Sequence, residues 1–589
     1  MRYKHFLKPI AGILFLAILV SCSVNGKKSI VILETTDLHG VILPYDFIEK
    51  ENLNASLANS ATYFNHLRSS NVPVVLLDNG DNLQGQPEMY YYNFIDTLSP
   101  HFSAEVMNYL GYDAGTVGNH DIEAGHTVYD RLIKEYDFPL LAANAINVKT
   151  GNPYFKPYVI IDKKGIRVAV FGLVTPSIPN SLPPELYSGI EFKDMEETAK
   201  QWMPVILREK PDLIVGLFHS GWDKDGYENG PNSSFNENGS VEVAYNVPGF
   251  DIIFNGHDHK PANEKFVNAA GDTVLILNGG SKSQNLAQAD VIFTSKKLNG
   301  KKHKFLSGKI LNVSDFGPDS EFMTKFALQN QTIHDYVDKV IGESKATLSS
   351  RESYFGSSAF IDMIQLIQLE ITGADVSFAA PLSFDVKIPV GPVTVGDMFK
   401  LYRYENMLYT MTMTGEEIKE YLEFSYGAWL NTMKGPGDML LKLRTGKDGK
   451  PLITGGKAWL KNLPYNFDSA AGIDYTVDVS KPEGERIIIS SFSDGRPFEK
   501  NLNYKVAVNS YRGNGGGGHF TEGAGINKDQ LRSRLISSTE RDLRYYILKS
   551  IEEKKIIDPK PLNNWRIIPQ DWVRPASSRE YLLLFGTTK

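Results

Sequence analysis

The sequence predicts an α/β protein with two folded domains. Its 589 residues exceed what one hydrophobic core usually organises, and 42% hydrophobic with 22% charged residues is the composition of a globular chain. Between residues 29 and 316, short runs rich in Val, Ile and Leu alternate with amphipathic segments, the pattern of buried strands and covering helices. Gly317-Pro318 then interrupts the chain before a second region of mixed strand and helix patterns.

The N-terminal segment has the composition of a signal peptide. Basic residues among the first eight precede an apolar run over residues 10–20, well short of the roughly 20 residues that span a bilayer. Small residues then lead to Cys22, where a bacterial lipoprotein signal places its lipid-bearing residue. We expect an exported lipoprotein, anchored in a membrane through Cys22, in the periplasm or on the surface of a bacterial cell. A plain secretion signal is the alternative.

Charge and cysteine content exclude several classes of function. The formal net charge is −7, and an acidic chain is a poor ligand for polyanions, so we expect no stable nucleic acid partner. An anionic substrate would need a local positive centre, such as metal ions. The single cysteine excludes a disulfide framework, a Cys-based zinc site and a Cys-ligated iron–sulfur cluster.

The first region supplies the strands and helices of one domain. Val-, Ile- and Leu-rich runs near Gly, Pro or Asn predict strands over residues 30–35, 74–77, 140–143, 158–161, 168–174, 213–218, 251–255 and 273–277. Helical candidates between them cover residues 58–68, 102–110, 126–136 and 196–209.

The second region begins after a predicted connecting helix. Residues 321–345 carry apolar residues at helical spacing and no glycine before Gly342. Residues 407–414 alternate like a strand, and Thr414 with Glu417 fits a capping box that opens a helix over residues 416–424. The predicted divisions are a signal peptide (1–22), a tether (23–29), a first domain (30–318), a linker helix (319–345), a second domain (346–575) and a peripheral tail (576–589).

Polar clusters follow the predicted strands of the first domain, at the rim where open α/β sheets bind ligands. They contain Asp37 and His39, Asp78 and Asp81, Asn119 and His120, His219, and His257 and His259. Neutral imidazole and carboxylate groups are ligands of divalent transition metals, and the set is too large for one tetrahedral ion. A lone D-x-H or H-x-H is more often ordinary hydrogen-bonding chemistry, but five clusters after strands favour two ions that share a bridging carboxylate.

In order and spacing these motifs resemble the calcineurin-like metallophosphoesterases over about residues 30–300. The resemblance implies a layered α/β sandwich with a dinuclear site. It implies one ion on Asp37, His39 and His259, a second on Asn119, His219 and His257, and Asp81 as the bridge. The ions would be two divalent cations (Mn, Zn, Fe or Co) roughly 3.5–4 Å apart, which activate a water and hold both oxygens of an in-line displacement.

The resemblance also implies a role for His120. In the family this histidine is not a ligand but contacts the substrate phosphate, and here it could protonate the leaving sugar oxygen. An acidic partner would fix its ring; 5′-nucleotidases of the family carry Asp three residues later, where this chain has Glu123. Asp78 lies close by and is interpreted as a strand-end cap or as support for the site.

The C-terminal half resembles the nucleotide-binding domain of 5′-nucleotidases and of 2′,3′-cyclic-nucleotide 2′-phosphodiesterase/3′-nucleotidases. The matching stretches are residues 407–422, 465–479 and 506–523. The family holds the base between two aromatic rings, which implies Phe467 and Tyr511 here. The alternative is that both are core aromatics. Asn514, Gly515 and Gly516 follow on a loop whose backbone can approach a ligand closely.

Departures from the family pattern decide between substrates. The 5′-nucleotidases carry a G-G-x-R segment whose arginines grip the nucleotide, whereas residues 379–383 here contain neither a glycine pair nor an arginine. Residues 401–406 look like the cyclic phosphodiesterase/3′-nucleotidase branch. We therefore expect a monomeric enzyme that converts 2′,3′-cyclic nucleotides and 3′-nucleotides to nucleoside and phosphate. The alternatives are a 5′-nucleotidase or nucleotide-sugar hydrolase, a hydrolase of another ester such as a sulfur-oxyanion ester, and a non-catalytic nucleotide-binding lipoprotein.

Overall fold

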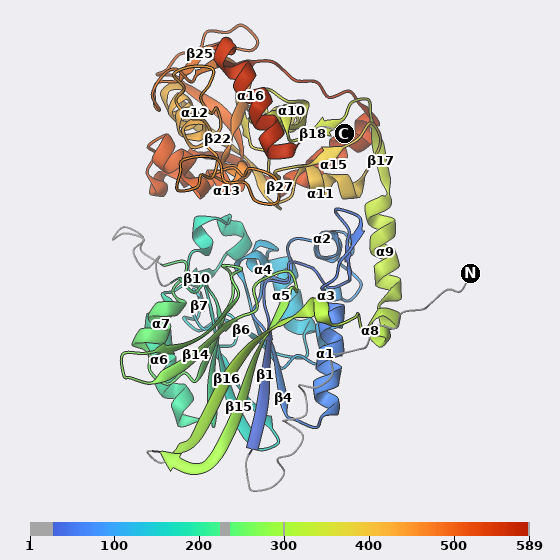
Figure 1. Ribbon diagram of the computed structural model, residues 1–589, viewed down its shortest axis with the longest axis vertical. Helices are drawn as coiled ribbons and strands as arrows, with labels where there is room; N and C mark the ends of the chain where they lie inside the picture. Colours follow the sequence, from blue (N-terminus) through green and yellow to red (C-terminus); the bar gives the residue numbers. More distant parts are fainter. Residues whose placement is uncertain (1–27, 224–235, 299–300, 587–589) are drawn as a thin grey trace, which may run out of the picture.

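The computed structural model describes residues 28–223, 236–298 and 301–586. The predicted signal peptide, Cys22 and almost all of the tether lie outside the described residues. Two domains lie one above the other along the long axis of the molecule, and α9 (Ala327–Asp338) runs along one side between them (Figure 1). None of the helices in the described residues combines the length and apolar character needed to cross a membrane.

The N-terminal domain is a sandwich of two six-stranded sheets. The first sheet has the order β16-β15-β1-β4-β5-β6, with β16 Lys301–Asn312, β15 Asn285–Leu298, β1 Lys28–Thr35, β4 Val74–Asp78, β5 Ala114–Thr116 and β6 Leu140–Leu141. The second has the order β13-β14-β12-β11-β9-β8, with β13 Ala262–Val267, β14 Thr273–Asn278, β12 Ile252–Asn255, β11 Leu213–His219, β9 Ile166–Val174 and β8 Tyr158–Lys163.

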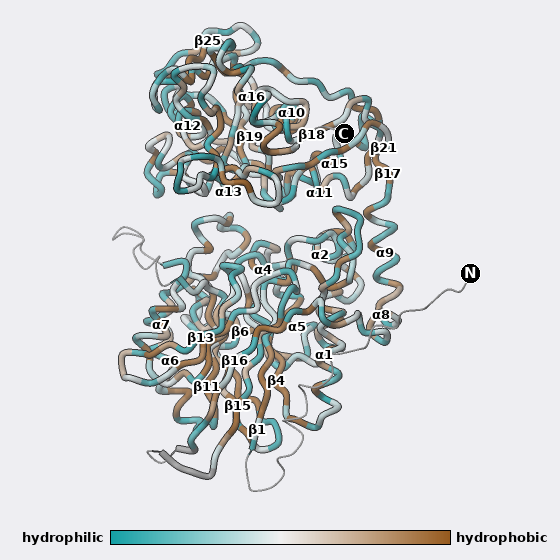
Figure 2. Tube along the Cα trace, in the orientation of Figure 1, coloured by the Kyte–Doolittle hydropathy of each residue, from teal (hydrophilic) through white to brown (hydrophobic). Residues whose placement is uncertain are grey.

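The alternation of side chains along each strand builds three apolar layers. On β1, Ile30 and Ile32 face the second sheet, while Val31 and Leu33 belong to the cluster under the outer helices. Strands of this domain are accordingly among the most hydrophobic segments of the chain (Figure 2). The first sheet is covered by α1 (Leu57–Ser69), α2 (Pro87–Phe94) and α3 (Phe102–Leu110), and the second by α6 (Met195–Arg208) and α7 (Ser240–Asn246).

The layered sandwich predicted for this domain is confirmed. Each of the eight predicted strands and four predicted helices has a counterpart, including α5 (His126–Glu135), although their ends shift by a few residues. The long antiparallel pair of β15 and β16, and the helix α2, are not among the predicted elements. Strands β1, β4, β5 and β6 run parallel, as do β9, β11, β12 and β14, so their carboxyl ends share one edge of the sandwich.

The C-terminal domain is also α/β. Its main sheet has the order β23-β19-β26-β22-β27, with β23 Ser469–Ala471, β19 Val376–Ala379, β26 Asn503–Asn509, β22 Met407–Thr414 and β27 Leu535–Asp542. A second sheet contains β24 (Ile473–Asp478), β25 (Ile487–Phe492) and β29 (Trp565–Ile568), and the larger helices are α10 (Ala359–Thr372), α12 (Gly415–Trp429) and α15 (Leu543–Lys554). The predicted capping box is confirmed: Thr414 accepts from Glu417 N, and the Glu417 side chain accepts from Thr414 N.

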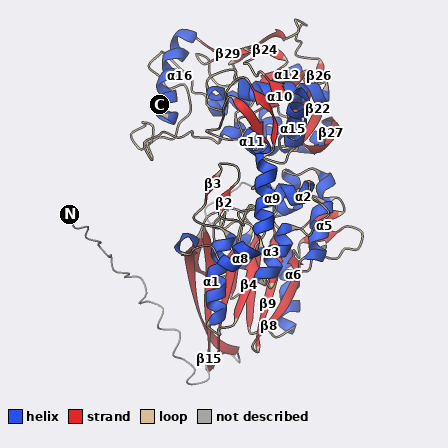
Figure 3. Ribbon diagram, turned by 90° about the vertical axis from the view of Figure 1, so that its right-hand side faces the viewer, coloured by secondary structure: helices blue, strands red, loops and turns tan. Residues whose placement is uncertain are grey.

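The single linker helix predicted over residues 319–345 is wrong. Two helices replace it, α8 (Ser320–Lys325) and α9, with a break at Phe326, where φ is −101° and ψ is 20°. Phe322 and Phe326 are buried in the core of the N-terminal domain, so packing turns the chain at this point. The last part is the strand β17 (Val340–Ser344), which pairs with β21 (Gly391–Thr394) and β28 (Ile556–Ile557) of the second domain. Figure 3 shows α9 crossing from one domain to the other.

The peripheral tail predicted over residues 576–589 is also wrong for the part that the structure describes. Residues 570–585 form the helix α16 (Gln570–Phe585), which inserts Ala576, Leu584 and Phe585 into the main core of the C-terminal domain. The carboxylate of Glu580 accepts hydrogen bonds from the backbone N–H groups of Leu440 and Leu441, both at 2.7 Å. The local sequence carried no sign of these distant partners.

Candidate active site

The predicted metal ligands meet at the carboxyl-end edge of the sandwich, on loops with unusual backbone conformation. Asp37, His39, Asp81, His257 and His259 all have left-handed φ angles, between 47° and 74°. Such conformations cost non-glycine residues about 1–3 kcal/mol each and persist only where the surroundings enforce them. Two backbone bonds of 2.9 Å hold the first two loops together, from Asp37 N to Gly80 O and from His39 N to Asp81 O.

One group of ligand atoms comes from the loops after β1 and β12. Atoms of Asp37, His39 and His259 all lie within 4.8 Å of one another. The two imidazole Nε2 atoms are 3.0 Å apart, and Nε2 of His259 is 3.3 Å from Oδ1 of Asp37. Asp37 is fully buried, whereas His259 remains open to solvent.

A second group combines Asp81, His219 and His257, whose ligand atoms also lie within 4.8 Å of one another. Nε2 of His219 is 3.2 Å from Oδ2 of Asp81. The amide oxygen of Asn119 joins this group, 3.2 Å from Nε2 of His219 and 2.8 Å from Nδ1 of His257. The structure therefore brings all seven predicted ligands into two adjacent groups, while their roles as ligands stay predictions.

Backbone carbonyls orient the two most enclosed imidazoles. Nδ1 of His219 lies 2.6 Å from the carbonyl oxygen of Asn79, and Nδ1 of His39 lies 3.1 Å from that of Gln84. A carbonyl only accepts, so each Nδ1 carries a proton and each Nε2 points toward the cluster. Burial lowers the pKa of His39 to about 4, which keeps this ring in the neutral form that binds metal.

Asp121, which follows His120 in the sequence and has no role among the predicted site residues, holds the loops in place. Its buried carboxylate accepts hydrogen bonds from the backbone N–H groups of Asp81, Asn82, Leu83 and Gly118, at 2.8–3.1 Å. Asp78 has a similar structural role, accepting from Thr35 Oγ1 at 2.7 Å and from Gly80 N at 3.0 Å. Of the two carboxylates in this loop, Asp81 therefore reaches the cluster and Asp78 supports the loop.

The chemistry of the donor set fits divalent cations. Four imidazole nitrogens, two carboxylates and an amide oxygen converge in a mostly buried space, with His259 at its open side. Burial would raise the pKa of Asp37 and of Asp81, but neighbouring histidines outweigh it, so both pKa values lie below their usual range. Burying these groups without a cation would be unfavourable, and a mixed N/O set suits Mn, Zn, Fe or Co.

His120 and Glu123 lie beside the cluster on the short helix α4 (Asn119–Glu123). Nδ1 of His120 is 2.5 Å from Oε2 of Glu123, and the backbone N–H of His120 donates to Oδ1 of Asp81 at 2.8 Å. Burial disfavours the charged ring, but the carboxylates of Asp81 and Glu123 outweigh it and raise the pKa of His120 to about 10. The geometry predicted for the pair is therefore retained with Glu in place of Asp.

The structure contradicts Phe467 as a ring that stacks on a base. The Phe467 side chain is 0% exposed. One face lies flat against Trp429, with centroids 5.1 Å apart and an interplanar angle of 3°, and the ring also meets Tyr354 edge-on. A ring enclosed in this way has no free face for a ligand, so the core interpretation of Phe467 holds.

Tyr404 is a further aromatic candidate that was not among the predicted site residues. It is partly exposed, and its ring meets the Tyr465 ring edge-on, with centroids 6.3 Å apart. Tyr511 is partly exposed as well. Tyr404 lies in residues 401–406, the stretch that resembles the cyclic phosphodiesterase/3′-nucleotidase branch. This stretch was used to choose between substrates and not to find a residue that binds the base. Next to Tyr404, burial raises the pKa of Glu405 to about 8, although Arg544 lies 3.5 Å from its carboxylate, and Glu405 lines the same cavity as Glu123.

The glycine-rich loop after β26 packs under Tyr511. Asn514, Gly515 and Gly516 follow α13 (Ser510–Gly513), and a Cβ at Gly516 would lie 2.5 Å from the Tyr511 ring. Buried Arg512 anchors the loop by donating to Gly516 O at 3.1 Å and to Asp468 Oδ2 at 2.9 Å. Glycine is required here because any side chain would displace the aromatic ring.

Two known families match successive parts of the chain. The calcineurin-like phosphoesterase family matches residues 30–261, and the 5′-nucleotidase C-terminal domain matches residues 340–522. The two matches correspond to the sandwich that carries the cluster and to the domain that carries Tyr404 and Tyr511.

Named relatives are similar along most of the chain. The 2′,3′-cyclic-nucleotide 2′-phosphodiesterase/3′-nucleotidase of Salmonella typhimurium is 27% identical over 616 residues, which cover 94% of this chain and 91% of the relative. The trifunctional nucleotide phosphoesterase protein YfkN of Bacillus subtilis is 28% identical over 91% of this chain, but the match spans only 39% of YfkN. In structure, the 5′-nucleotidase precursor of Thermus thermophilus superposes with a TM-score of 0.60 at 21% identity, covering 92% of this chain and 100% of that chain.

Proposed function

We propose that this chain, which joins a calcineurin-like phosphoesterase domain to a 5′-nucleotidase C-terminal domain, hydrolyses 2′,3′-cyclic nucleotides and 3′-nucleotides to nucleoside and phosphate. The observation that carries the proposal is the place of the two ligand groups. They lie beside His120 and Glu123, and the second domain brings Glu405, which follows Tyr404 in the sequence, to a cavity that Glu123 also lines. A phosphate at the cluster and a base at the tyrosines would then belong to one substrate.

Each group of residues has a distinct task in the proposed reaction. Divalent cations held by the seven ligands would supply the positive charge that polarises the phosphoryl group and the attacking water. His120 would donate a proton to the leaving sugar oxygen, because its raised pKa keeps the ring protonated at neutral pH. Glu123 would hold Nδ1 of that ring, so that Nε2 is the atom that delivers the proton.

The preference for the 3′ side rests on the second domain. Ala379, at the end of β19, opens residues 379–383, a segment without arginine, which removes the cations that 5′-nucleotidases are expected to place there. The names of the Salmonella relative and of similar proteins from Yersinia enterocolitica and Haemophilus influenzae agree with this choice. A 5′-nucleotidase, which is the name of a relative from Vibrio cholerae, is the competing assignment.

Product release from three substrates tests the proposal. We expect turnover of 2′,3′-cyclic AMP and 3′-AMP in the presence of Mn²⁺, loss of turnover with a chelator, and little release of phosphate from 5′-AMP. Faster hydrolysis of 5′-AMP would assign the chain to the 5′-nucleotidases instead. Absence of turnover on all three, with metal bound, would favour another phosphate or sulfur-oxyanion ester, or a protein that only binds nucleotides.

The tyrosines should affect nucleotides selectively. We expect Tyr404→Ala and Tyr511→Ala each to raise KM for 3′-AMP roughly tenfold, because stacking on an aromatic ring contributes about 1–3 kcal/mol per base. Hydrolysis of p-nitrophenyl phosphate, which has no base, should change little. Phe467→Leu is the matched control, since it alters a core ring and should lower stability without a selective rise in KM. A selective rise for Phe467→Leu alone would restore the original assignment.

A further inference from the structure

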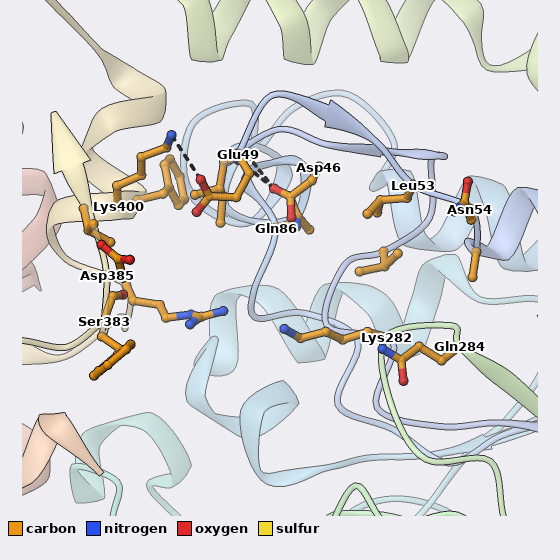
Figure 4. A pocket seen from close by; sticks show the side chains of 17 residues that line it. Asp46, Glu49, Leu53, Asn54, Gln86, Lys282, Gln284, Ser383, Asp385 and Lys400 are labelled. Atoms are coloured by element: carbon orange, nitrogen blue, oxygen red, sulfur yellow. Dashed lines mark hydrogen bonds and ion pairs between the residues drawn. The ribbon is translucent and has the colours of Figure 1, made fainter. Parts of the chain in front are cut away.

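A cavity lies between the domains, next to the loops that carry the predicted metal ligands. Its volume is about 440 Å³, within the range of about 300–1,000 Å³ typical of ligand pockets. The N-terminal domain contributes Val41, Gln86 and Lys282, and the C-terminal domain contributes Ser383, Lys400 and Arg403. Figure 4 shows the Lys282 side chain extending into the space between the two sets of residues.

Half of the charged side chains on the cavity wall already have an ion-pair partner. Lys400 pairs with Glu49 at 3.3 Å, as Figure 4 also shows. Asp385 forms a two-bond ion pair with Arg351, which lies outside the lining, at 2.6 and 3.0 Å. Asp46 accepts the backbone N–H groups of two following residues at 2.8 and 2.9 Å and keeps its negative charge. Two cations remain on the wall beside this one carboxylate.

Lys282 and Arg403 are these two cations, which exceed the one remaining carboxylate by a single positive charge. Within the described part of the chain, neither side chain has an ion pair or a hydrogen bond, although both line the same cavity. Partial burial lowers the pKa of Lys282, and the nearby positive charge of Arg403 lowers it further, while the negative charge of Asp46 opposes this shift without cancelling it. An anion between them would relieve this repulsion, and both side chains are suited to bind phosphate oxygens.

The cavity is distinct from the place of the reacting phosphate. It is nevertheless close enough to the ligand loops for one substrate to occupy both. Neither the seven ligands nor His120 lines it. Its wall nonetheless backs onto the ligand loops, because Lys282 N donates to Asp37 O at 2.8 Å and Gln86 N donates to His39 O at 3.0 Å. On the other side, Arg403 directly precedes Tyr404. An anion held here would therefore lie next to the ligand loops on one side and next to the residue before Tyr404 on the other.

We propose that Lys282 and Arg403 form a subsite for a second phosphate group, the 5′-phosphate of a nucleotide whose 3′-phosphate is hydrolysed. The inference rests on the proposed function and extends it to nucleoside 3′,5′-bisphosphates. The two cations come from different domains, so a substrate with both phosphates would be held by both domains at once.

The test compares adenosine 3′,5′-bisphosphate with 3′-AMP. We expect the wild-type enzyme to show a kcat/KM about tenfold or more higher for the bisphosphate, and the Lys282→Gln/Arg403→Gln double variant to lose that preference while turnover of 3′-AMP stays within about twofold. The charge-retaining double variant Lys282→Arg/Arg403→Lys is the matched control and should keep most of the preference. Equal losses on both substrates would mean that these cations act at the reacting phosphate, and no preference in wild type would mean that the cavity binds no phosphate; either result overturns the inference.

Calorimetry separates this inference from the proposed function. With chelator present, adenosine 3′,5′-bisphosphate should bind wild type about tenfold more tightly than 3′-AMP, and the glutamine double variant should bind the two equally. Absence of 3′-AMP hydrolysis by the metal-loaded wild type would refute the proposed function alone. Equal binding of the two nucleotides by wild type would refute the subsite alone.

Discussion

Replacing Asp81 by asparagine is expected to remove much of the bound metal and to lower kcat/KM for 3′-AMP roughly a thousandfold or more. The Asp81 carboxylate lies 3.2 Å from Nε2 of His219 and accepts the backbone N–H of His120 at 2.8 Å. An amide of the same shape keeps one oxygen but loses the charge that attracts two cations. Metal content by mass spectrometry and steady-state kinetics measure the two effects.

Asp78→Asn is the matched control for this substitution. Asp78 lies three residues earlier on the same loop and is equally buried, but its carboxylate faces Thr35 and Gly80. We expect this variant to retain metal and most of its activity, with some loss of stability. Full metal content and activity in Asp81→Asn, or loss of metal in Asp78→Asn alone, would show that the wrong carboxylate has been assigned.

Replacing His120 by alanine is expected to lower kcat for 3′-AMP by about 10²–10⁴-fold, the usual contribution of a general acid. Metal content should be unchanged, because the two ligand groups do not include this ring. A substrate with a good leaving group, such as p-nitrophenyl phosphate, needs no proton at the leaving oxygen and should lose much less. A comparison of the two substrates on the same variant therefore isolates proton donation.

His126→Ala is the control for His120→Ala. This histidine lies on the next helix and contacts Asp130 at 3.2 Å and Ser188 O at 2.9 Å. The substitution His126→Ala should leave kcat for both substrates nearly unchanged. An equal loss on both substrates in His120→Ala would mean that the ring binds the phosphate instead of protonating the leaving group.

Much of the fold and of the cluster was predictable because it depends on local patterns. A buried parallel strand leaves its mark as a short Val-, Ile- and Leu-rich run, and its carboxyl end is where ligand-binding loops begin. Asp37, His219 and His257 each follow such a run, so the residue pattern alone was enough to infer that they meet at one edge of the sandwich. The same logic identified β22 and the capping box at Thr414.

Features that depend on distant packing could not be predicted in this way. Phe467 and Tyr404 are both aromatic residues in matched stretches, and only their surroundings separate a ring stacked on Trp429 from a ring that remains partly exposed. The break at Phe326 has the same origin, since burial of that side chain in the first domain overrides a helical pattern. Likewise, the residues of α16 that are buried are those that contact the core of the C-terminal domain, and this core is formed by distant parts of the chain.

The sequence by itself indicated the residues predicted to hold the metal ions, because imidazole, carboxylate and amide groups follow the predicted strands in a recognisable order. Only the tertiary structure shows which side chains hold the ligand loops in place and which residues of the second domain lie near them. Asp121 acts through four backbone N–H groups of two loops, and Lys282 meets Arg403 only because the domains pack against each other. Such contacts depend on the path of the folded backbone, and residue type and spacing say little about that path.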